Sequence, residues 1–213
     1  VNWDKKKMSE VSTEVRNGFV GTATPHYQDN GVPYLQSFNV RENKIDSEDE
    51  MIEISEEFHE DNPDTRIYEG DMLTVQSGHI GISAIVPERY DGVNCHALII
   101  TRFDEEEVYP EYVAYFMNSE IGKSLIKSVT VGTTVKHLNT SDLRKFELPI
   151  PPMEEQKRIA EILSTFGDQI REYKEEKEQL QRLKKGLMQD LLTGSVRTGE
   201  GVEVLDEVVE VES

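Results

Sequence analysis

Cysteine is nearly absent from this chain, and none of its apolar runs is long. The single Cys95 allows neither an internal disulfide bond nor a zinc site built from cysteines. The longest apolar runs, such as 97–100, are far shorter than the ~20 residues of a membrane helix, and the N-terminal segment has no apolar signal-peptide core. We therefore expect a cytoplasmic protein that does not enter membranes.

Positive charge is scarce as well. The chain has 23 Lys and Arg against 42 Asp and Glu, a net charge of −19, whereas nucleic-acid binders usually carry a basic surface. Thirteen acids lie in 42–71 and six in 199–213, while 117–146 holds five basic residues against two acids. A locally basic segment therefore remains. The acidic excess fits either a generic acidic surface, as in a high-salt host, or a protein that binds no DNA.

The signatures of common catalytic sites are missing. The chain has no P-loop, G-x-G-x-x-G or G-x-S-x-G motif, no N-P-P-(F/Y) signature of adenine methyltransferases, and no histidine pair at metal-ligand spacing. Asp71 with Glu69, or the acidic run 104–107, could in principle hold a metal. On so acidic a chain we interpret both as solvated surface. We expect no metal and no catalytic centre.

Prolines at 149, 151 and 152 divide the sequence, because the residue before a proline is disfavoured in a helix. Upstream, a periodic apolar pattern predicts a helix from Pro110 to Leu125, and Thr140 or Ser141 can cap a short second one. Short apolar segments bounded by turn residues predict strands at 32–38, 51–54, 71–76, 80–86 and 96–101. This pattern predicts an α+β domain over 1–148, with a mixed or antiparallel sheet.

Downstream of the prolines, the sequence from Glu154 to about Thr193 contains no proline. It predicts one helix of ~40 residues, ~60 Å long, that ends at Gly194. Apolar side chains recur along it in a coiled-coil-like stripe, which needs a partner helix to cover it. We therefore predict a spacer helix over 149–194, followed at 195–213 by an acidic, disordered tail.

Two segments of this helical half carry a resemblance to a known family. The sequences LPIPPMEEQKRIAEIL at 148–163 and QRLKKGLMQDLLTG at 181–194 are similar to the start and end of the spacer helix in specificity subunits of Type I restriction-modification enzymes. Upstream, GVPYLQ at 31–36, GDMLTVQSGHIG at 70–81 and GTTVKHLN at 132–139 resemble landmarks of that family's target-recognition domain, in order and spacing. The resemblance covers about 18–194.

The resemblance implies a subunit that reads double-stranded DNA and carries no catalysis of its own. A complete subunit of that family has two recognition domains and two spacer helices. It binds methyltransferase subunits and, in some complexes, restriction subunits. S-adenosylmethionine, ATP and Mg²⁺ belong to those partners, so we expect no cofactor on this chain. With one domain and one helix, this chain is either a fragment or a half-length subunit that forms a homodimer through the helix.

Two loops are the strongest candidates for DNA contact. The first loop is QSGHIG at 76–81. Its glutamine can pair with adenine, and its serine or histidine can contact bases or phosphates. The alternative is a plain hairpin turn in which the glycines serve the backbone geometry alone. In the second loop, 132–139, hydroxyls and a lysine suit phosphates, and His137 or Asn139 suits a base edge. The alternative is an ordinary loop in which Asn139 and Thr140 cap the next helix. With one residue near the first strand, the predicted DNA-binding set is Gln36, Gln76, Ser77, Gly78, His79, Thr133, Thr134, Lys136, His137 and Asn139.

The helix supplies the predicted subunit interface, which would dock a methyltransferase subunit or a second spacer helix. The alternative is packing of the helix against its own domain near Glu154. Two other functions stay open: an assembly module whose recognition domain no longer binds DNA, and a nuclease that uses the acidic clusters. The predicted interface residues are Arg158, Ile159, Ile162, Leu163, Phe166, Ile170, Tyr173, Leu180, Leu183 and Leu187.

Overall fold

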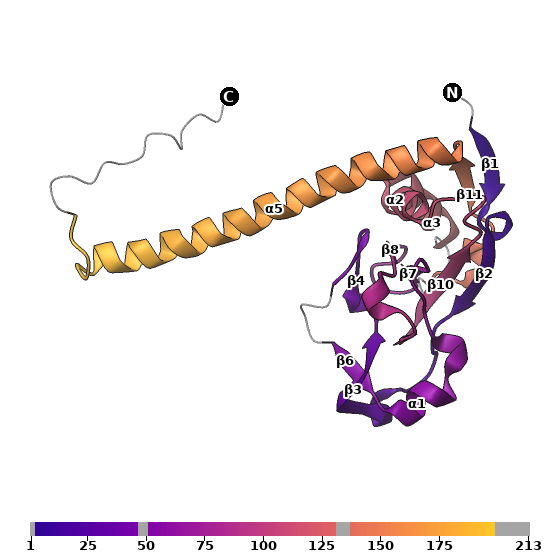
Figure 1. The fold of residues 1–213 in the computed structure, drawn as a ribbon, viewed down its shortest axis with the longest axis horizontal. Helices are drawn as coiled ribbons and strands as arrows, with labels where there is room; N and C mark the ends of the chain where they lie inside the picture. Colours follow the sequence, from indigo (N-terminus) through magenta and orange to yellow (C-terminus); the bar gives the residue numbers. More distant parts are fainter. Residues whose placement is uncertain (1–2, 47–50, 131–136, 199–213) are drawn as a thin grey trace. The chain divides into compact units, whose positions relative to one another are not determined.

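The computed structural model describes residues 3–46, 51–130 and 137–198 (Figure 1). The chain forms two compact units, Val1–Leu163 and Ser164–Ser213. The predicted α+β class is confirmed, with antiparallel sheets, one mixed sheet and a long C-terminal helix. In chain order the elements are β1 (Asp4–Lys7), β2 (Ser12–Asn17), β3 (Tyr27–Leu35), β4 (Val40–Arg41), β5 (Lys44–Ile45), β6 (Ile52–Ile54), α1 (Glu56–Asp61), β7 (Met72–Val75), β8 (Ser83–Ile85), β9 (Asn94–Cys95), β10 (Leu98–Phe103), α2 (Pro110–Asn118), α3 (Glu120–Thr130), α4 (Thr140–Leu143), β11 (Glu147–Ile150) and α5 (Met153–Leu192).

The central sheet has four antiparallel strands in the order β2-β10-β7-β8. Successive side chains of a strand point to opposite faces of a sheet. In β10, Ile99 packs into one apolar cluster, and Leu98 and Ile100 pack into another. In β7, Met72 and Leu73 divide between the same two clusters. Both faces of this sheet are therefore buried, which explains the uninterrupted apolar run at 97–100.

Two helices cover one face of the central sheet, where the sequence predicted a single helix from Pro110 to Leu125. Val113 and Met117 of α2 and Ile126 of α3 enter the same cluster as Ile99. Between the helices Ser119 has an extended backbone, and its Oγ accepts a hydrogen bond from the Gly122 amide at 3.2 Å. The hydroxyl satisfies a free amide at the start of α3 and so favours a new helix over a continuous one.

A second sheet has the order β6-β3-β9, and an aromatic cluster lies beside it. The Phe58 ring of α1 stacks on His26 at 4.4 Å between ring centroids and meets the Phe19 ring edge-on at 4.9 Å. The buried Tyr34 hydroxyl lies 3.1 Å from Nδ1 of His96, and burial lowers the pKa of that histidine. The aromatic rings thus join α1 to the start of β3 and to the segment before β10.

The strand β1 was not predicted from the sequence, because its residues Asp4–Lys7 are all charged. It pairs antiparallel with β11, and Lys5 lies opposite Pro149. Proline is tolerated in such a two-stranded edge ladder because it need not donate a hydrogen bond there. The N-terminal segment is therefore tied to the residues that lead into α5.

The predicted long helix is confirmed as α5, Met153–Leu192, and the chain leaves the helical conformation at Gly194, whose φ is +72°. The predicted division into a domain at 1–148, a spacer helix at 149–194 and a tail at 195–213 stays a prediction. Most of the predicted tail, 199–213, lies outside the described residues. Across the residues that the structure describes, no helix has both the length and the apolar character needed to span a bilayer.

Cys95 is fully buried in the cluster that contains Leu98 and Ile100, and burial raises the pKa of its thiol from 9.0 to about 12. Because a thiol reacts as the thiolate, we expect the folded protein to resist labelling by a disulfide reagent at about pH 8. The raised pKa contributes stability in full below pH 9.0, and this contribution is lost as the pH rises toward about 12. The assay is thiol titration with and without denaturant; equal labelling rates in the two conditions would contradict the prediction.

Candidate nucleic-acid interface

The turn between β7 and β8 carries the first predicted DNA-contact segment, and its tip is exposed. The Gly81 amide donates to the Val75 carbonyl oxygen at 2.9 Å, which closes the turn. Gly78 has a φ of +76°, a backbone conformation that glycine adopts without strain. Ser77, Gly78 and His79 are all exposed. The turn therefore presents one hydroxyl and one imidazole to the solvent.

Gln76 behaves differently from the tip, because only 3% of it is exposed. Its side-chain Nε2 donates to Oδ1 of Asn17 at 2.7 Å, and its backbone oxygen accepts from the Leu138 amide at 2.9 Å. A base contact by Gln76 would break the bond to Asn17, so the geometry favours a positioning role. Direct readout by this side chain stays a prediction.

The second predicted segment lies next to the first. The hydrogen bond from Leu138 to Gln76 places His137, Leu138 and Asn139 beside the start of the turn. His137 is half-buried and Asn139 is exposed. Thr133, Thr134 and Lys136 lie outside the described residues. Two loops that are about sixty residues apart in the sequence thus meet at one place.

Asn139 is the residue that precedes α4, as the capping alternative predicted. Its backbone oxygen accepts from the amides of Asp142 and Leu143, whereas its side-chain Nδ2 lies 3.5 Å from the Asp142 carboxylate. The side chain makes no hydrogen bond to the helix backbone. The main chain of Asn139 therefore starts the helix, and its carboxamide is not needed as the cap.

Helix α3 packs against the turn between β7 and β8. Gly81 has a φ of +88°, which glycine adopts without strain, and a Cβ there would lie 2.2 Å from Cδ1 of Ile126, so a larger residue would be strained and would also displace this side chain. On the same helix Nζ of Lys123 lies 2.9 Å from the Glu42 carboxylate, and this hydrogen bond raises the pKa of the lysine. Lys145 lies 3.6 Å from Asp142. The basic segment predicted over 117–146 is thus partly neutralised by neighbouring acids.

Gln36 is the residue that follows β3. Its Nε2 donates to the Tyr27 hydroxyl at 2.8 Å, and its amide donates to Oδ1 of Asn39 at 2.9 Å. The structure gives no hydrogen bond between Gln36 and either loop within the described residues. Its part in DNA contact stays a prediction.

Asn17 was not predicted from the sequence; it is the last residue of β2, is exposed and accepts the Gln76 hydrogen bond. The residue after it, Gly18, donates its amide to the Leu98 carbonyl oxygen at 2.8 Å. A Cβ on Gly18 would lie 2.5 Å from Sγ and 2.6 Å from the backbone oxygen of Cys95. A polar residue followed by glycine at a strand end was the available signal.

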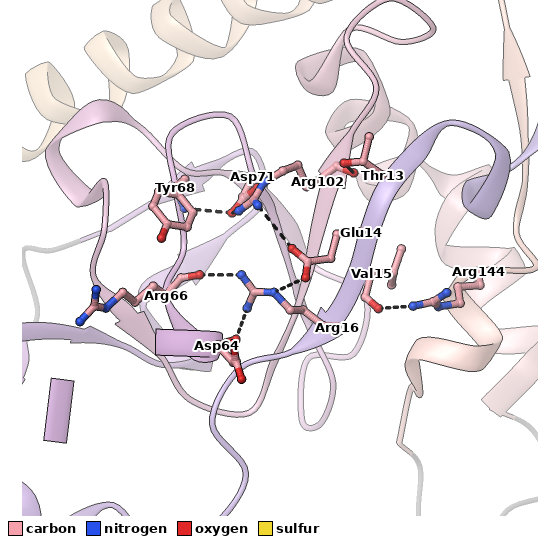
Figure 2. Close-up of polar contacts among 10 residues, drawn as sticks. All are labelled: Thr13, Glu14, Val15, Arg16, Asp64, Arg66, Tyr68, Asp71, Arg102 and Arg144. Atoms are coloured by element: carbon pink, nitrogen blue, oxygen red, sulfur yellow. Dashed lines mark hydrogen bonds and ion pairs between the residues drawn. The ribbon is translucent and has the colours of Figure 1, made fainter. Parts of the chain in front are cut away.

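Asp71 is buried, with 1% exposure, so the expectation that it belongs to a solvated acidic surface is wrong. Figure 2 shows its surroundings. Arg102 donates to both carboxylate oxygens of Asp71 at 2.9 Å, and this hydrogen bonding raises the pKa of the arginine. The Tyr68 amide donates to the same carboxylate at 2.9 Å. Glu69 remains exposed, as expected.

Arg16 connects β2 to the segment before β7 (Figure 2). Its guanidinium donates to the backbone oxygens of Asp64 at 2.5 Å and Arg66 at 2.7 Å, and it lies 3.0 Å from the Glu14 carboxylate. Glu14 also lies 3.4 Å from Arg102. This network holds β2, β10 and the loop 64–71 together. Within the described part of the chain, no group of three His, Cys, Asp or Glu side chains could hold a metal.

The first turns of α5 are fixed to the domain through Gln156, which is 1% exposed. Its Oε1 accepts from the Tyr109 amide at 2.9 Å, and its Nε2 donates to the Pro151 oxygen at 2.9 Å. Ile159 packs against the core and Ala160 is buried. For Ile159 the structure thus shows contact with its own domain, the alternative considered from the sequence.

The other predicted interface residues are all exposed, and their role in assembly stays a prediction. Apolar side chains exposed along α5 continue to its C-terminal end, where Met188, Leu191 and Leu192 extend the stripe. These exposed predicted residues are Arg158, Ile162, Leu163, Phe166, Ile170, Tyr173, Leu180, Leu183 and Leu187.

A family model and the curated relatives of this chain identify the same protein family. The family model described as "Type I restriction modification DNA specificity domain" matches residues 1–182. The Type I restriction enzyme MjaVIII specificity subunit of Methanocaldococcus jannaschii is 27% identical over 201 residues, which are 92% of this chain and 47% of that protein. The Type I restriction enzyme StySPI specificity subunit of Salmonella potsdam is 26% identical over 205 residues, which are 91% of this chain and 42% of that protein.

The fold has solved counterparts. The crystal structure of the HsdS subunit from Thermoanaerobacter tengcongensis aligns with a TM-score of 0.61 at 20% identity, over 95% of this chain and 51% of that one. The chain spans about half the length of the curated relatives that it matches.

Proposed function

Because the chain belongs to the family of Type I restriction-modification DNA specificity domains, we propose that it reads one part of the DNA target of a Type I restriction-modification complex. The family match over residues 1–182 carries this proposal, since it includes both candidate loops and most of α5. The role of that family is recognition rather than catalysis. Phosphate contacts would set the register on the duplex, and a few loop side chains would read base edges.

The candidate interface supports this function through its chemistry. The exposed Ser77 hydroxyl and His79 imidazole can donate to bases or phosphates, and Gln76 and Gly81 fix the turn that presents them. The adjacent segment adds His137 and Asn139. The first group follows β7 and the second precedes α4, so both are attached to secondary-structure elements that can hold a recognition site in place.

The chemistry of modification and cleavage belongs, in this proposal, to partner subunits. Methyltransferase subunits would bind S-adenosylmethionine, and restriction subunits, where present, would use ATP and Mg²⁺. A solved structure that aligns with a TM-score of 0.62 concerns the complex assembly and conformational transition of a Type I system. The complex would act in the cytoplasm, where the cell's DNA is accessible to it.

Recognition of the complete DNA target would require a second recognition domain. This chain covers 46% and 47% of two curated relatives, and α5 exposes an apolar stripe from Ile162 to Leu191. A second spacer helix, from a second copy or from a companion segment, would cover that stripe. The contact would also set the separation of two DNA half-sites.

The decisive experiment is selection of bound duplexes from a random DNA pool, with this chain and its methyltransferase subunit over a series of salt concentrations. We expect a short motif to be enriched. His79→Ala should weaken discrimination by ~1–3 kcal/mol at one position. Lys136→Ala with His137→Ala should weaken binding and reduce its dependence on salt.

Lys174→Ala is the matched control, because Lys174 is an exposed lysine of α5 far along the chain from both loops. Its binding should equal that of the wild type. If no motif is enriched at any salt concentration while the protein complex still forms, the chain is an assembly module rather than a DNA reader.

A further inference from the structure

Asn17 occupies the place where the candidate interface meets the central sheet. It ends β2 and lies opposite Ile99 of β10, while Gln76 lies just beyond the end of β7, on the other side of β10. Asn17 is exposed, whereas Gln76 is buried. Asn17 thus lies beside the turn that presents Ser77 and His79.

The orientation of the Asn17 carboxamide is fixed by its neighbour. Its Oδ1 accepts the hydrogen bond from Nε2 of Gln76 at 2.7 Å. Gln76 is buried, and its backbone oxygen accepts a hydrogen bond from the Leu138 amide. Nε2 of Gln76 therefore cannot move to keep its hydrogen bond if the Asn17 carboxamide rotates. With the oxygen engaged, the two N–H groups of Nδ2 are the remaining donors of this exposed side chain.

The backbone at Asn17 is equally constrained. Gly18 is hydrogen-bonded to Leu98 and approaches Cys95 so closely that no side chain fits. A fixed backbone and a fixed carboxamide lose little conformational entropy when a ligand binds. An exposed donor that is held in this way has the properties of a base-reading group, because it distinguishes an acceptor from a donor on a base edge.

We propose that Asn17 is a specificity-determining residue, whose amide donates a hydrogen bond to an acceptor on a base edge, and that Gln76 is its positioning residue. The proposal rests on the proposed function and extends it to a residue outside both loops. The acceptors available in the major groove are N7 and O6 of guanine, N7 of adenine and O4 of thymine.

The test repeats the DNA selection with Asn17→Asp in the complex with the methyltransferase subunit. The aspartate still accepts from Gln76, but it has no amide group to donate. We expect unchanged thermal unfolding, and a loss of about three- to tenfold in discrimination at one base pair, with a shift there toward bases that present a donor. Gln76→Leu, which removes the positioning donor, should relax the same base pair and no other.

Asn30→Asp is the matched control, because Asn30 is an exposed asparagine of β3 and the change adds the same charge. It should leave the motif unchanged. An equal loss on all sequences for Asn17→Asp would indicate a phosphate contact or general repulsion, and an unaltered motif would show that Asn17 does not read DNA; either result overturns the proposal. Absence of any motif with the wild-type chain would instead defeat the proposed function, and this inference with it.

Discussion

Arg102→Met is expected to lower the free energy of unfolding by about 3 kcal/mol. The substitution leaves the Asp71 carboxylate buried, with only the Tyr68 amide as a partner among the bonds described above. An uncompensated buried charge typically costs about 3–5 kcal/mol, and the lower end applies because the Arg102 side chain is 38% exposed. Urea denaturation of the wild type and the variant measures the difference.

Two further variants make this result interpretable. Arg41→Met replaces an exposed arginine and should change stability by no more than about 0.5 kcal/mol. Asp71→Leu combined with Arg102→Met removes both charges and should recover at least half of the loss. If the double variant is no more stable than Arg102→Met alone, the destabilisation does not come from the unpaired carboxylate.

Gln156→Leu is expected to destabilise the domain by about 2–4 kcal/mol. The leucine occupies a similar volume but leaves the Tyr109 amide and the Pro151 carbonyl without the partners that they have in the structure. Each buried polar group without a partner costs about 1–3 kcal/mol. Denaturant unfolding measures the loss in the free energy of unfolding of the domain. Hydrogen exchange at the Tyr109 amide, which should become faster, measures the local loss of protection.

Gln169→Leu is the control for this substitution, because Gln169 is an exposed glutamine of the same helix. Its effect should stay within about 0.5 kcal/mol. If both variants lose the same stability, or if the Tyr109 amide exchanges at the wild-type rate, Gln156 does not anchor α5.

The elements with strong apolar patterns were predicted from the sequence. All of the run at 97–100 except Ala97 lies in β10, and the periodic stretch after Pro152 lies in α5. The missed elements depend on contacts between distant residues. The all-charged β1 becomes a strand only because β11 pairs with it, and the break at Ser119 depends on a hydroxyl that caps the next helix.

The candidate site was predicted less completely than the fold. Both loops were identified, but their meeting through the Leu138 to Gln76 hydrogen bond was not, because no local pattern shows such a contact. The burial of Asp71 was missed because its partner, Arg102, lies 31 residues away. Asn17 was missed for the same reason, since its role depends on Gln76.

The turn between β7 and β8 also bears on how such a protein can acquire a new preference. Gln76 and Gly81 are buried, and they hold the two sides of the turn. Ser77 and His79 are exposed, and a Cβ on Gly78 would meet no atom within 4 Å. Substitutions at these tip positions therefore alter the exposed chemistry at little cost to the hairpin. A combinatorial library confined to 77–79, with a residue that tolerates positive φ kept at 78, could vary recognition on an intact scaffold.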